Sequence, residues 1–379
     1  MGRLGRLRRS RRAIGVAAAV AVLAVAAVLD VPGRLGTLTP ADPPVGRSTP
    51  TSSPTTDPGE LVPAPGGDRT DLDRCTPGSA VLARCGPAPA LDGDEWVGSD
   101  PLDLADLRGS VVLVAFFSSS CVACGRDARY LTAWQRLYGR AGLRVVGVDS
   151  PQFAFEQDPA RLAQTLRDRA ITFPVLHDTD SSVLAGYRTD VRPSTYLLDR
   201  DGTVRAVTLG EGGHFRVEAQ IRKLLAEGRA GTLPDPLREL DDGEDAEPGT
   251  TPQIDLADSR GARYDEESDT VTTDGTRFRL PDAQPIGTFS FGGPWTVGRQ
   301  DAVPGATGVA RVSFRGRTAY QLVGGSGSLV VTSTDGTVRR IRVDGDPEPR
   351  RIHVSETVGP ETLTVRYEGD LRVYAFAFG

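Results

Sequence analysis

Two cysteines with the spacing C-x-x-C are the residues with the clearest chemical potential in this chain. Cys121 and Cys124 lie within "VVLVAFFSSSCVACGRDARYLTAWQ", residues 111–135, between a continuous apolar run and a segment with helical periodicity. Such a pair is typical of a disulfide-exchange site, of half a metal site or of a structural disulfide. The surroundings of the two cysteines must distinguish these alternatives.

The number of available ligands disfavours a metal site. A structural zinc ion takes four nitrogen or sulfur ligands, commonly from two C-x-x-C pairs or from one pair with histidines. The other cysteines, Cys75 and Cys85, have nine residues between them, and His177, His214 and His353 occur singly. We therefore expect no metal ion, and the sequence indicates no cofactor.

Disulfide exchange needs a thiolate at working pH and a second thiol within reach of the mixed disulfide. A cysteine at a strand-to-helix turn lies beside unpaired backbone N–H groups and the positive end of the helix dipole. That position lowers a thiol pKa from about 8.5 into the range of about 3.5–7.5. The three-residue offset puts Cys124 on the same helical face as Cys121. A purely structural disulfide in this place would be exposed and labile, so the pattern favours exchange.

The cysteines must be positioned by an alternation of strands and helices. Strands are expected at Val111–Phe117 and at 143–150, and helices at 126–138 and at 158–170, the latter with Asp158 as its cap and Pro159 first. A hairpin is expected at 195–210 around Asp201-Gly202, and an amphipathic helix at 215–228. This order predicts an α/β domain.

The N-terminus predicts export. Residues 1–12 are strongly basic, and Ala13–Leu29 follow without a charge. This apolar run is near the short end of a membrane-spanning helix and equally resembles the apolar part of a cleaved signal. Both readings keep the arginines cytoplasmic and place the rest of the chain outside, where cysteine pairs are expected to be disulfides or exchange catalysts.

The remaining regions read as linkers and a second domain. Residues 31–71 are rich in Pro, Thr, Ser and Gly, and residues 232–250 form an acidic, Pro-bounded linker. From 251 onward, short alternating runs are broken by Asp-Gly and Gly-rich turns, which predicts an all-β domain. The formal net charge of −6 disfavours a nucleic-acid binder, which usually carries a clustered basic face.

Several segments together resemble a known family. They are "LRGSVVLVAFFSSSCVACGRDARYLTAWQRLY", "GLRVVGVDSPQFAFEQDP", "RPSTYLLDRDG", "GEGGHFRVEAQIRKLL" and the final "VYAFAFG". The chain resembles extracytoplasmic thioredoxin-like proteins of the TlpA/ResA-like group, and from about residue 87 onward the soluble C-terminal region of DipZ-type proteins. The resemblance implies a thioredoxin fold followed by an all-β sandwich of jelly-roll or carbohydrate-binding-module type.

The resemblance and the patterns above divide the chain into five parts. They are an N-terminal membrane anchor or signal (1–30), a linker with a Cys pair (31–86), a thioredoxin-like domain (87–231), an acidic linker (232–250) and a β-sandwich domain (251–379).

The resemblance also implies roles for individual residues. Cys121 is the attacking cysteine, Cys124 the resolving one, and Pro193 matches the cis-proline that faces the C-x-x-C. Ala115 stands where many thioredoxins bury an aspartate that handles the proton of the resolving thiol. Asp127, three residues after Cys124, matches a catalytic glutamate of ResA-like proteins and is expected either to handle that proton or only to complement the helix dipole.

Further residues have two readings each. Glu156 and Glu211 match recurrent family segments and are either proton-handling groups or solvated loop acids. Trp295, in "GGPWTVGRQDA", is a candidate stacking platform for a sugar, although a lone tryptophan in a sandwich usually belongs to the core. Cys75 and Cys85 are expected to form a structural disulfide, with a four-cysteine relay as the alternative.

The sequence thus predicts a membrane-tethered extracytoplasmic thiol:disulfide oxidoreductase, or a secreted one if the N-terminal segment is cleaved. Its partners would be exported protein thiols or disulfides, a separate redox protein and a cell-envelope carbohydrate. The Val122-Ala123 dipeptide leaves the direction of electron flow open. The alternative is a non-catalytic cell-envelope binding protein in which the thioredoxin fold is a scaffold and the β-domain binds carbohydrate.

Overall fold

The structure is a computed structural model that describes residues 72–93, 95–227, 232–237, 240, 247–257, 270–272 and 275–379. The expected anchor or signal at 1–30, and residues 31–71 of the expected linker, lie outside these ranges. None of the helices within the described ranges is long and apolar enough to cross a membrane.

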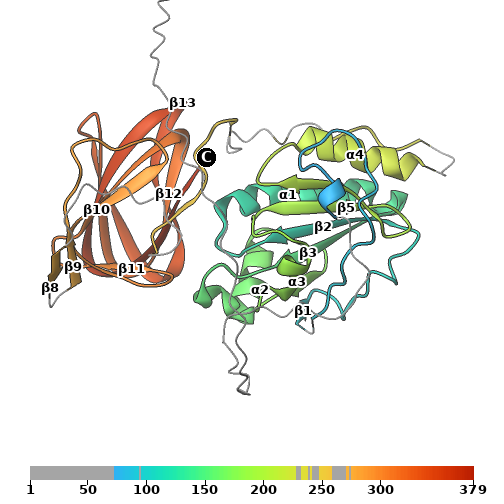
Figure 1. Ribbon diagram of the computed structural model, residues 1–379, viewed down its shortest axis with the longest axis horizontal. Helices are drawn as coiled ribbons and strands as arrows, with labels where there is room; N and C mark the ends of the chain where they lie inside the picture. Colours follow the sequence, from blue (N-terminus) through green and yellow to red (C-terminus); the bar gives the residue numbers. More distant parts are fainter. Residues whose placement is uncertain are drawn as a thin grey trace, which may run out of the picture. The chain divides into compact units, whose positions relative to one another are not determined.

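The first described domain is built on a six-stranded mixed sheet (Figure 1). Its strand order is β1-β4-β3-β2-β5-β6, in which β2, β3 and β4 are parallel and the other pairings are antiparallel. The strands are β1 (Trp96–Val97), β2 (Val111–Phe117), β3 (Leu143–Asp149), β4 (Val175–His177), β5 (Ser194–Leu198) and β6 (Val204–Leu209).

Four α-helices accompany this sheet among the described residues. They are α1 (Val122–Tyr138), α2 (Pro159–Asp168), α3 (Ser182–Gly186) and α4 (His214–Ala226). The two parallel crossovers, the hairpin β5–β6 and the closing helix α4 make up a thioredoxin-like fold, as the family resemblance implied. The expected strands, hairpin and helices are confirmed, whereas β1, β4 and α3 are additions that the sequence patterns did not predict.

The central strand β2 separates two apolar cores. All seven of its residues are buried, and their side chains alternate between the two faces of the sheet. Val111, Leu113 and Ala115 pack in the core formed with α1, α2 and α4. Val112 and Val114 pack in the core formed with α3 and the segment before β1. A strand buried on both faces explains why residues 111–117 read as an unbroken apolar run.

The disulfide Cys75–Cys85 lies in this second core. Its Cα–Cα distance is 5.5 Å, and both cysteines pack among residues on the face of β2 that carries Val112 and Val114. The segment is also tied to β6 by backbone hydrogen bonds, including one from the N–H of Cys85 to the carbonyl of Val204 at 2.9 Å. Cys121 and Cys124 belong to the other core, so the sheet separates the two cysteine pairs.

The second domain is all-β, as the alternating segments predicted. Its described strands are β7 (Ile254–Asp255), β8 (Thr270–Thr272), β9 (Gly275–Phe278), β10 (Thr288–Val297), β11 (Ala302–Pro304), β12 (Val309–Ser333) and β13 (Val338–Phe378). The pairings β10–β11, β11–β13, β13–β12 and β12–β10 form a closed circuit of strands. Leu329 of β12 faces both Ile341 and Tyr367 of β13, so β12 pairs with both halves of β13.

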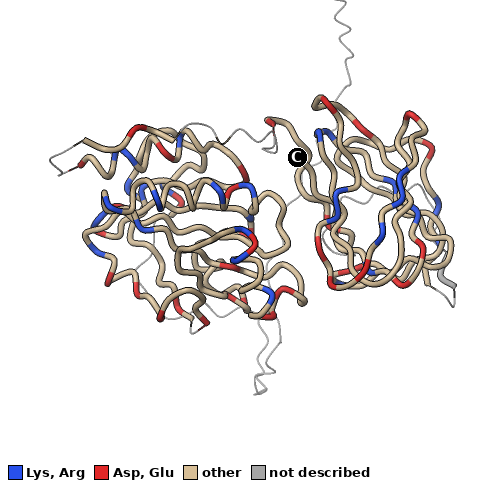
Figure 2. The backbone as a smooth tube through the Cα atoms, turned by 180° about the vertical axis from the view of Figure 1, so that it is seen from behind, with Lys and Arg blue, Asp and Glu red and all other residues tan. Residues whose placement is uncertain are grey.

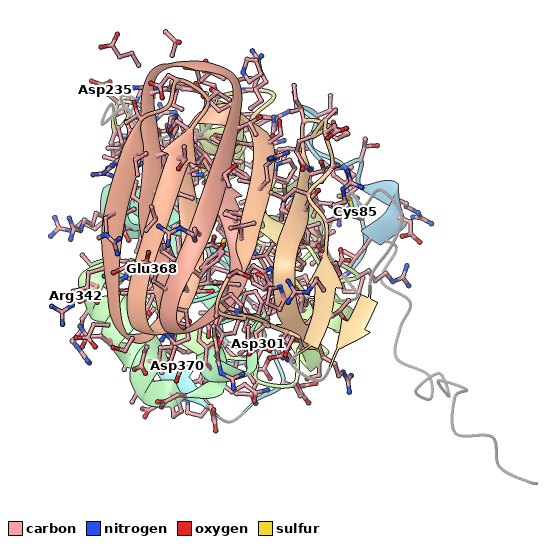
Figure 3. All side chains as sticks on the ribbon, turned by 90° about the vertical axis from the view of Figure 1, so that its left-hand side faces the viewer. Cys85, Asp235, Asp301, Arg342, Glu368 and Asp370 are labelled. Carbon is pink, nitrogen blue, oxygen red and sulfur yellow. A yellow bond between two sulfur atoms is a disulfide. The ribbon has the colours of Figure 1, made fainter. Side chains whose placement is uncertain are left out.

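Aromatic rings fill the interior of this closed sheet. Trp295 is 0 % exposed, stacks on Phe291 with 4.2 Å between ring centroids, and donates its indole N–H to the carbonyl of Gly292 at 3.1 Å. The ring therefore belongs to the core and offers no face to a sugar. The outward side chains of β12 and β13 include charged residues such as Arg342 and Glu368 (Figure 3). Positive and negative residues are interspersed over both domains (Figure 2).

Candidate active site

The C-x-x-C cysteines form a disulfide at the start of α1. Cys121 and Cys124 have a Cα–Cα distance of 5.2 Å. Cys121 is the N-cap residue of α1 in an extended conformation, and its Sγ accepts a hydrogen bond from the backbone N–H of Cys124 at 3.0 Å. A sulfur in this position is the acceptor for one of the N–H groups that a helix start leaves unpaired. The same contact stabilises a thiolate once the disulfide opens.

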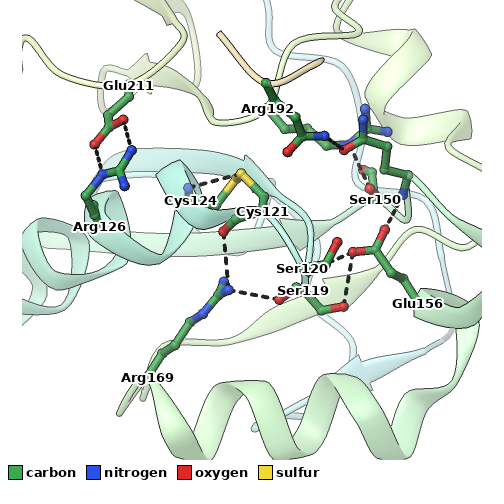
Figure 4. The surroundings of a disulfide bond; sticks show 12 residues. Ser119, Ser120, Cys121, Cys124, Arg126, Ser150, Glu156, Arg169, Arg192 and Glu211 are labelled. Atoms are coloured by element: carbon green, nitrogen blue, oxygen red, sulfur yellow. Dashed lines mark hydrogen bonds and ion pairs between the residues drawn. A yellow bond between two sulfur atoms is a disulfide. The ribbon is translucent and has the colours of Figure 1, made fainter. Parts of the chain in front are cut away.

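The loop before Cys121 is held from one side by a buried glutamate (Figure 4). Glu156, which is 0 % exposed, accepts hydrogen bonds on Oε1 from the backbone N–H of Ser120 at 2.7 Å and from the hydroxyl of Ser119 at 3.3 Å. Its Oε2 accepts from the backbone N–H groups of Gln152 and Phe153, at 2.6 and 2.9 Å. One carboxylate thus joins the loop after β2 to the loop after β3.

A half-buried arginine holds the same loop through its carbonyl groups. The guanidinium of Arg169, at the C-terminal end of α2, donates to the carbonyl oxygen of Ser119 at 2.8 Å and to that of Cys121 at 3.3 Å (Figure 4). Glu156 therefore accepts from this loop while Arg169 donates to it. Hydrogen bonds to charged groups are the stronger kind, so the pair fixes the position of Cys121 more firmly than neutral contacts would.

Cys124 faces a small cavity of about 10 Å³ that it shares with Pro193 and Asp127. This volume is at the lower limit for one water molecule. The peptide bond between Arg192 and Pro193 is cis, as the resemblance implied for this proline. Ala115 also lines the cavity. It occupies the position in β2 where many thioredoxins have a buried aspartate. Among the lining residues, Asp127 supplies the sole carboxylate.

Asp127 is a buried acid with a perturbed pKa. Its side chain is 11 % exposed, and burial raises its pKa above the ordinary value for aspartate. A hydrogen bond with His214 opposes that rise without cancelling it. Asp127 is therefore no solvated helix-N-terminal acid: it is a group that keeps its proton at pH values where an exposed aspartate has lost it.

His214, the first residue of α4, is the partner of Asp127. Its Nε2 lies 2.7 Å from Oδ1 of Asp127, and its ring stacks on Tyr130 with 3.6 Å between centroids and 11° between planes. The sequence treated His214 as a scattered histidine, because the 87 positions that separate it from Asp127 give no local signal.

Glu211 is engaged in an ion pair. The guanidinium of Arg126 in the first turn of α1 donates to both carboxylate oxygens of Glu211, with the Nη2–Oε2 distance 2.7 Å (Figure 4). Glu211 and Glu156 were expected as proton-handling groups or solvated loop acids. Both carboxylates are engaged in hydrogen bonds and neither is a solvated loop acid: Glu211 pairs with Arg126, and Glu156 accepts from the loop before α1.

A second buried acid, Asp149, escaped the sequence patterns. It ends β3 beside Phe117 and is 0 % exposed, and its Oδ2 lies 3.4 Å from Nε2 of His177. Burial and the nearby Glu156 raise its pKa well above the ordinary value for aspartate. In the sequence, an acid at the end of an apolar strand is typical of the start of a solvated loop. In the structure, the pairing of β3 with β2 places Asp149 next to Phe117, just before the loop that precedes Cys121.

Two family models match the chain, one for each described domain. The AhpC/TSA family model matches residues 86–207, and the model for the thioredoxin-like C-terminal domain matches residues 251–379. The first contains the C-x-x-C, Asp127 and Pro193. The second covers the closed β-domain.

Curated relatives match over different lengths. The chain is 31 % identical to the protein DipZ of Mycobacterium tuberculosis over 81 % of this chain, and it spans 45 % of that relative, so it corresponds to about half of it. It is 28 % identical to the thiol-disulfide oxidoreductase ResA of Geobacillus kaustophilus, over 32 % of this chain and 67 % of ResA.

A crystal structure matches the central domain. The thiol-disulfide isomerase of Corynebacterium glutamicum is 29 % identical with a TM-score of 0.34, over 37 % of this chain and 97 % of the isomerase. The fold and the two family models identify residues 86–207 as an AhpC/TSA-family domain and residues 251–379 as a thioredoxin-like C-terminal domain, and the chain is similar to DipZ- and ResA-type proteins.

Proposed function

We propose that this protein is an extracytoplasmic thiol:disulfide oxidoreductase that works through the Cys121/Cys124 dithiol and disulfide. The observation that carries the proposal is the position of Cys121 as the N-cap of α1, with its sulfur accepting the N–H of Cys124 and joined to that residue in a disulfide. This arrangement stabilises a thiolate at Cys121 and keeps a second thiol within bonding distance.

The exchange reaction follows from this arrangement. In the reducing direction, the Cys121 thiolate attacks a substrate disulfide, and a Cys121–substrate mixed disulfide forms while one substrate thiolate leaves. Cys124 then gives up its proton and attacks Sγ of Cys121. The Cys121–Cys124 bond forms, the bond to the substrate breaks, and the second substrate thiolate leaves with the electron pair. The oxidising direction is the same sequence reversed.

Two residues complete the proposed machinery. Pro193, which lines the cavity beside Cys124, presents the backbone edge on which a substrate chain rests. Asp127 takes the proton of Cys124 in the resolving step, because it is the sole carboxylate among the cavity-lining residues and the β2 position beside it is Ala115. Glu156 and Arg169 position the loop of Cys121 and take no part in proton transfer.

The location and the partners belong to the same proposal. The basic N-terminus and the apolar run Ala13–Leu29 support a single membrane anchor with the domains on the extracytoplasmic side. The substrates are thiols or disulfides of exported proteins, and a separate redox protein restores the active state. The name of ResA, a thiol-disulfide oxidoreductase, supports this activity.

For the β-domain we propose a jelly-roll-type sandwich that serves as an accessory module. Its antiparallel pairing and its aromatic core support an all-β module, and its closed circuit of strands is barrel-like. A role in carbohydrate binding is the rival function of the whole protein, with the thioredoxin fold as a scaffold. No observation favours it, because the ring of Trp295 that was to stack on a sugar is buried.

Substitution of the resolving cysteine tests the proposal. Cys124→Ser leaves the attack by Cys121 intact but removes the second thiol, so mixed disulfides with exported proteins should accumulate and be released by a reductant. The matched control, Cys121→Ser, should accumulate none. If both variants behave alike, or if the reduced wild-type protein reduces no model disulfide, the scaffold alternative replaces the enzymatic one.

A further inference from the structure

Asp127 touches two different environments through two different neighbours. On one side it lines the small cavity that also contains Cys124 and is otherwise bordered mainly by apolar side chains. On the other side it hydrogen-bonds His214, which lines an open cleft together with Cys121, Pro193 and Tyr130. Asp127 does not border that cleft. Among the described residues, the hydrogen bond between Asp127 and His214 therefore links the cavity to the cleft through two titratable side chains.

The geometry of His214 is set by two side-chain contacts and by the backbone turn that precedes it. Its Nε2 lies 2.7 Å from Oδ1 of Asp127, and its ring is nearly parallel to that of Tyr130. Gly212 and Gly213, with φ of +95° and +69°, make the left-handed turn that brings the histidine to the first position of α4. The N–H of Gly212 hydrogen-bonds the Asp127 carboxylate as well. The ring is thus held in place rather than free to rotate into solvent.

The proton in the hydrogen bond between Asp127 and His214 can be covalently bonded to either group. If Asp127 is ionised, the imidazole N–H donates to the carboxylate; if Asp127 is protonated, its O–H donates to the imidazole nitrogen. Histidine is the side chain whose charge changes most readily near neutral pH. A proton that reaches Asp127 from the cavity neutralises the carboxylate that favours the imidazolium form, so the imidazolium can release its other ring proton at the cleft without either side chain moving.

We propose that His214 is the positioning residue that couples resolution of the mixed disulfide to release of a proton in the cleft, by way of its hydrogen bond with Asp127. This inference rests on the proposed oxidoreductase function and adds a residue to it. When Cys124 attacks, its S–H bond breaks and the proton goes to the Asp127 carboxylate, which becomes neutral. The imidazolium of His214 keeps the N–H that donates to Asp127, and with the negative charge gone it releases the proton of its other ring nitrogen, Nδ1, to solvent in the cleft. In the oxidising direction the same path delivers a proton to the leaving Cys124 thiolate.

The charged groups around the pair leave this path open. Arg126 on α1 and Glu211 in the loop before α4 both interact electrostatically with Asp127, but they form a bidentate ion pair with each other. From β2 and β5, the cavity is lined by Ala115, Phe116, Phe117, Ser194 and Thr195, which contribute no titratable group at neutral pH. Tyr130 covers one face of the imidazole and leaves its ring nitrogens at the edge.

Two substitutions separate the functions of the imidazole. His214→Phe keeps a flat ring against Tyr130 but removes the hydrogen bond to Asp127. His214→Gln keeps a polar group able to reach Asp127 but cannot titrate. The matched control is His353→Gln, which removes a histidine of the β-domain that has no contact with Asp127 in the described structure.

The measurement is the reaction of the reduced full-length protein with dithionitrobenzoate, followed by stopped flow from acidic to alkaline pH. The first release of coloured thiolate reports attack by Cys121, and the second reports resolution by Cys124. We expect both His214 variants to retain the first phase and to slow the second by about tenfold or more, because loss of general acid–base assistance costs at least that much. His214→Phe should also move the midpoint of the second phase to higher pH, since the hydrogen bond that opposes the raised pKa of Asp127 is gone.

The His214→Gln variant decides between relay and simple support. Added imidazole buffer should accelerate its second phase in proportion to concentration, because a free base in the cleft replaces the missing one. A second phase of wild-type rate and pH profile in both variants overturns the inference, and so does full recovery by Gln alone. Loss of the first phase in the wild-type protein would instead overturn the proposed oxidoreductase function, so the two failures are distinguishable.

Discussion

At the scale of single residues, the two cysteines differ in what surrounds each sulfur. The Sγ of Cys121 accepts an N–H at the positive end of α1, whereas Cys124 faces an apolar cavity with a single carboxylate among its lining residues. The first environment favours the thiolate and the second favours the protonated thiol. The surroundings of each sulfur therefore support the proposed attacking role of Cys121 and the proposed resolving role of Cys124, independently of the family resemblance.

Replacement of Asp127 tests the proton-handling role at this scale. Because burial raises its pKa, the carboxylate form that accepts a proton becomes populated only as the pH rises through that raised value. Resolution by Cys124 should therefore accelerate with pH over this window in the wild-type protein. Asp127→Asn should slow resolution by about 10²-fold, remove this acceleration and leave alkylation of Cys121 nearly unchanged. Stopped-flow measurement of mixed-disulfide resolution checks it. Wild-type rates in the variant would leave Asp127 as a complement to the helix dipole.

At the scale of elements, the turn from β2 to α1 could be predicted from the sequence. The side chains that hold this turn in place could not. An apolar strand, a short polar loop and a helical period were visible in the sequence, and the structure has β2 and α1 at those places. The helix begins at Val122, earlier than the apolar period suggested, because the side chain of Cys121 acts as its cap. The site is also contacted by residues from loops and helices far along the chain, namely Glu156, Arg169 and His214. Local periodicity does not predict contacts between residues so far apart in sequence.

The support by Glu156 has a measurable consequence. Glu156→Gln replaces one acceptor oxygen by an NH₂ group that meets a backbone N–H, which should lower the free energy of unfolding by about 1–3 kcal/mol. It should also change the rate of Cys121 alkylation, because the loop of Ser119 and Ser120 is released. Chemical denaturation and alkylation kinetics measure the two effects.

A second buried glutamate provides the control. Glu218 on α4 accepts from the hydroxyl of Tyr138, at the opposite end of α1 from the cysteines. Glu218→Gln should cost comparable stability while leaving the alkylation rate of Cys121 at the wild-type value. Equal alkylation rates in both variants would show that Glu156 supports the fold alone.

At the scale of the molecule, one sheet keeps two cysteine pairs apart. Cys75 and Cys85 lie in the core on one face, and Cys121 and Cys124 lie in the core on the other. The composition of residues 75–85 allowed either a structural disulfide or a four-cysteine relay, and the placement of the two pairs in separate cores supports the structural disulfide. In the β-domain, the Asp-Gly and Gly-rich turns predicted short separate strands, whereas β12 and β13 are long and pair along both halves of β13. Non-local pairing of that kind cannot be read from local periodicity.

Removal of the Cys75–Cys85 disulfide should affect stability and leave the chemistry intact. The double variant Cys75→Ala, Cys85→Ala should lose about 2–3 kcal/mol of unfolding free energy, the amount expected for a loop of this length. Its rate of disulfide reduction below the melting temperature should match the wild type. Thermal denaturation and a disulfide-reduction assay test both parts, and a large loss of turnover with unchanged stability would favour the relay.

The central claim is that Cys121 alone is the nucleophile of an exchange-active pair, and alkylation of the fully reduced protein tests it most directly. Iodoacetamide labelling followed over pH, with each cysteine quantified by peptide mass spectrometry, gives the pKa and the rate of each thiol separately. We predict that Cys121 reacts far faster than Cys124 at neutral pH, with a pKa in the range of about 3.5–7.5. Equal labelling of Cys121 and Cys124, with a pKa of about 8.5 for each, would contradict the account.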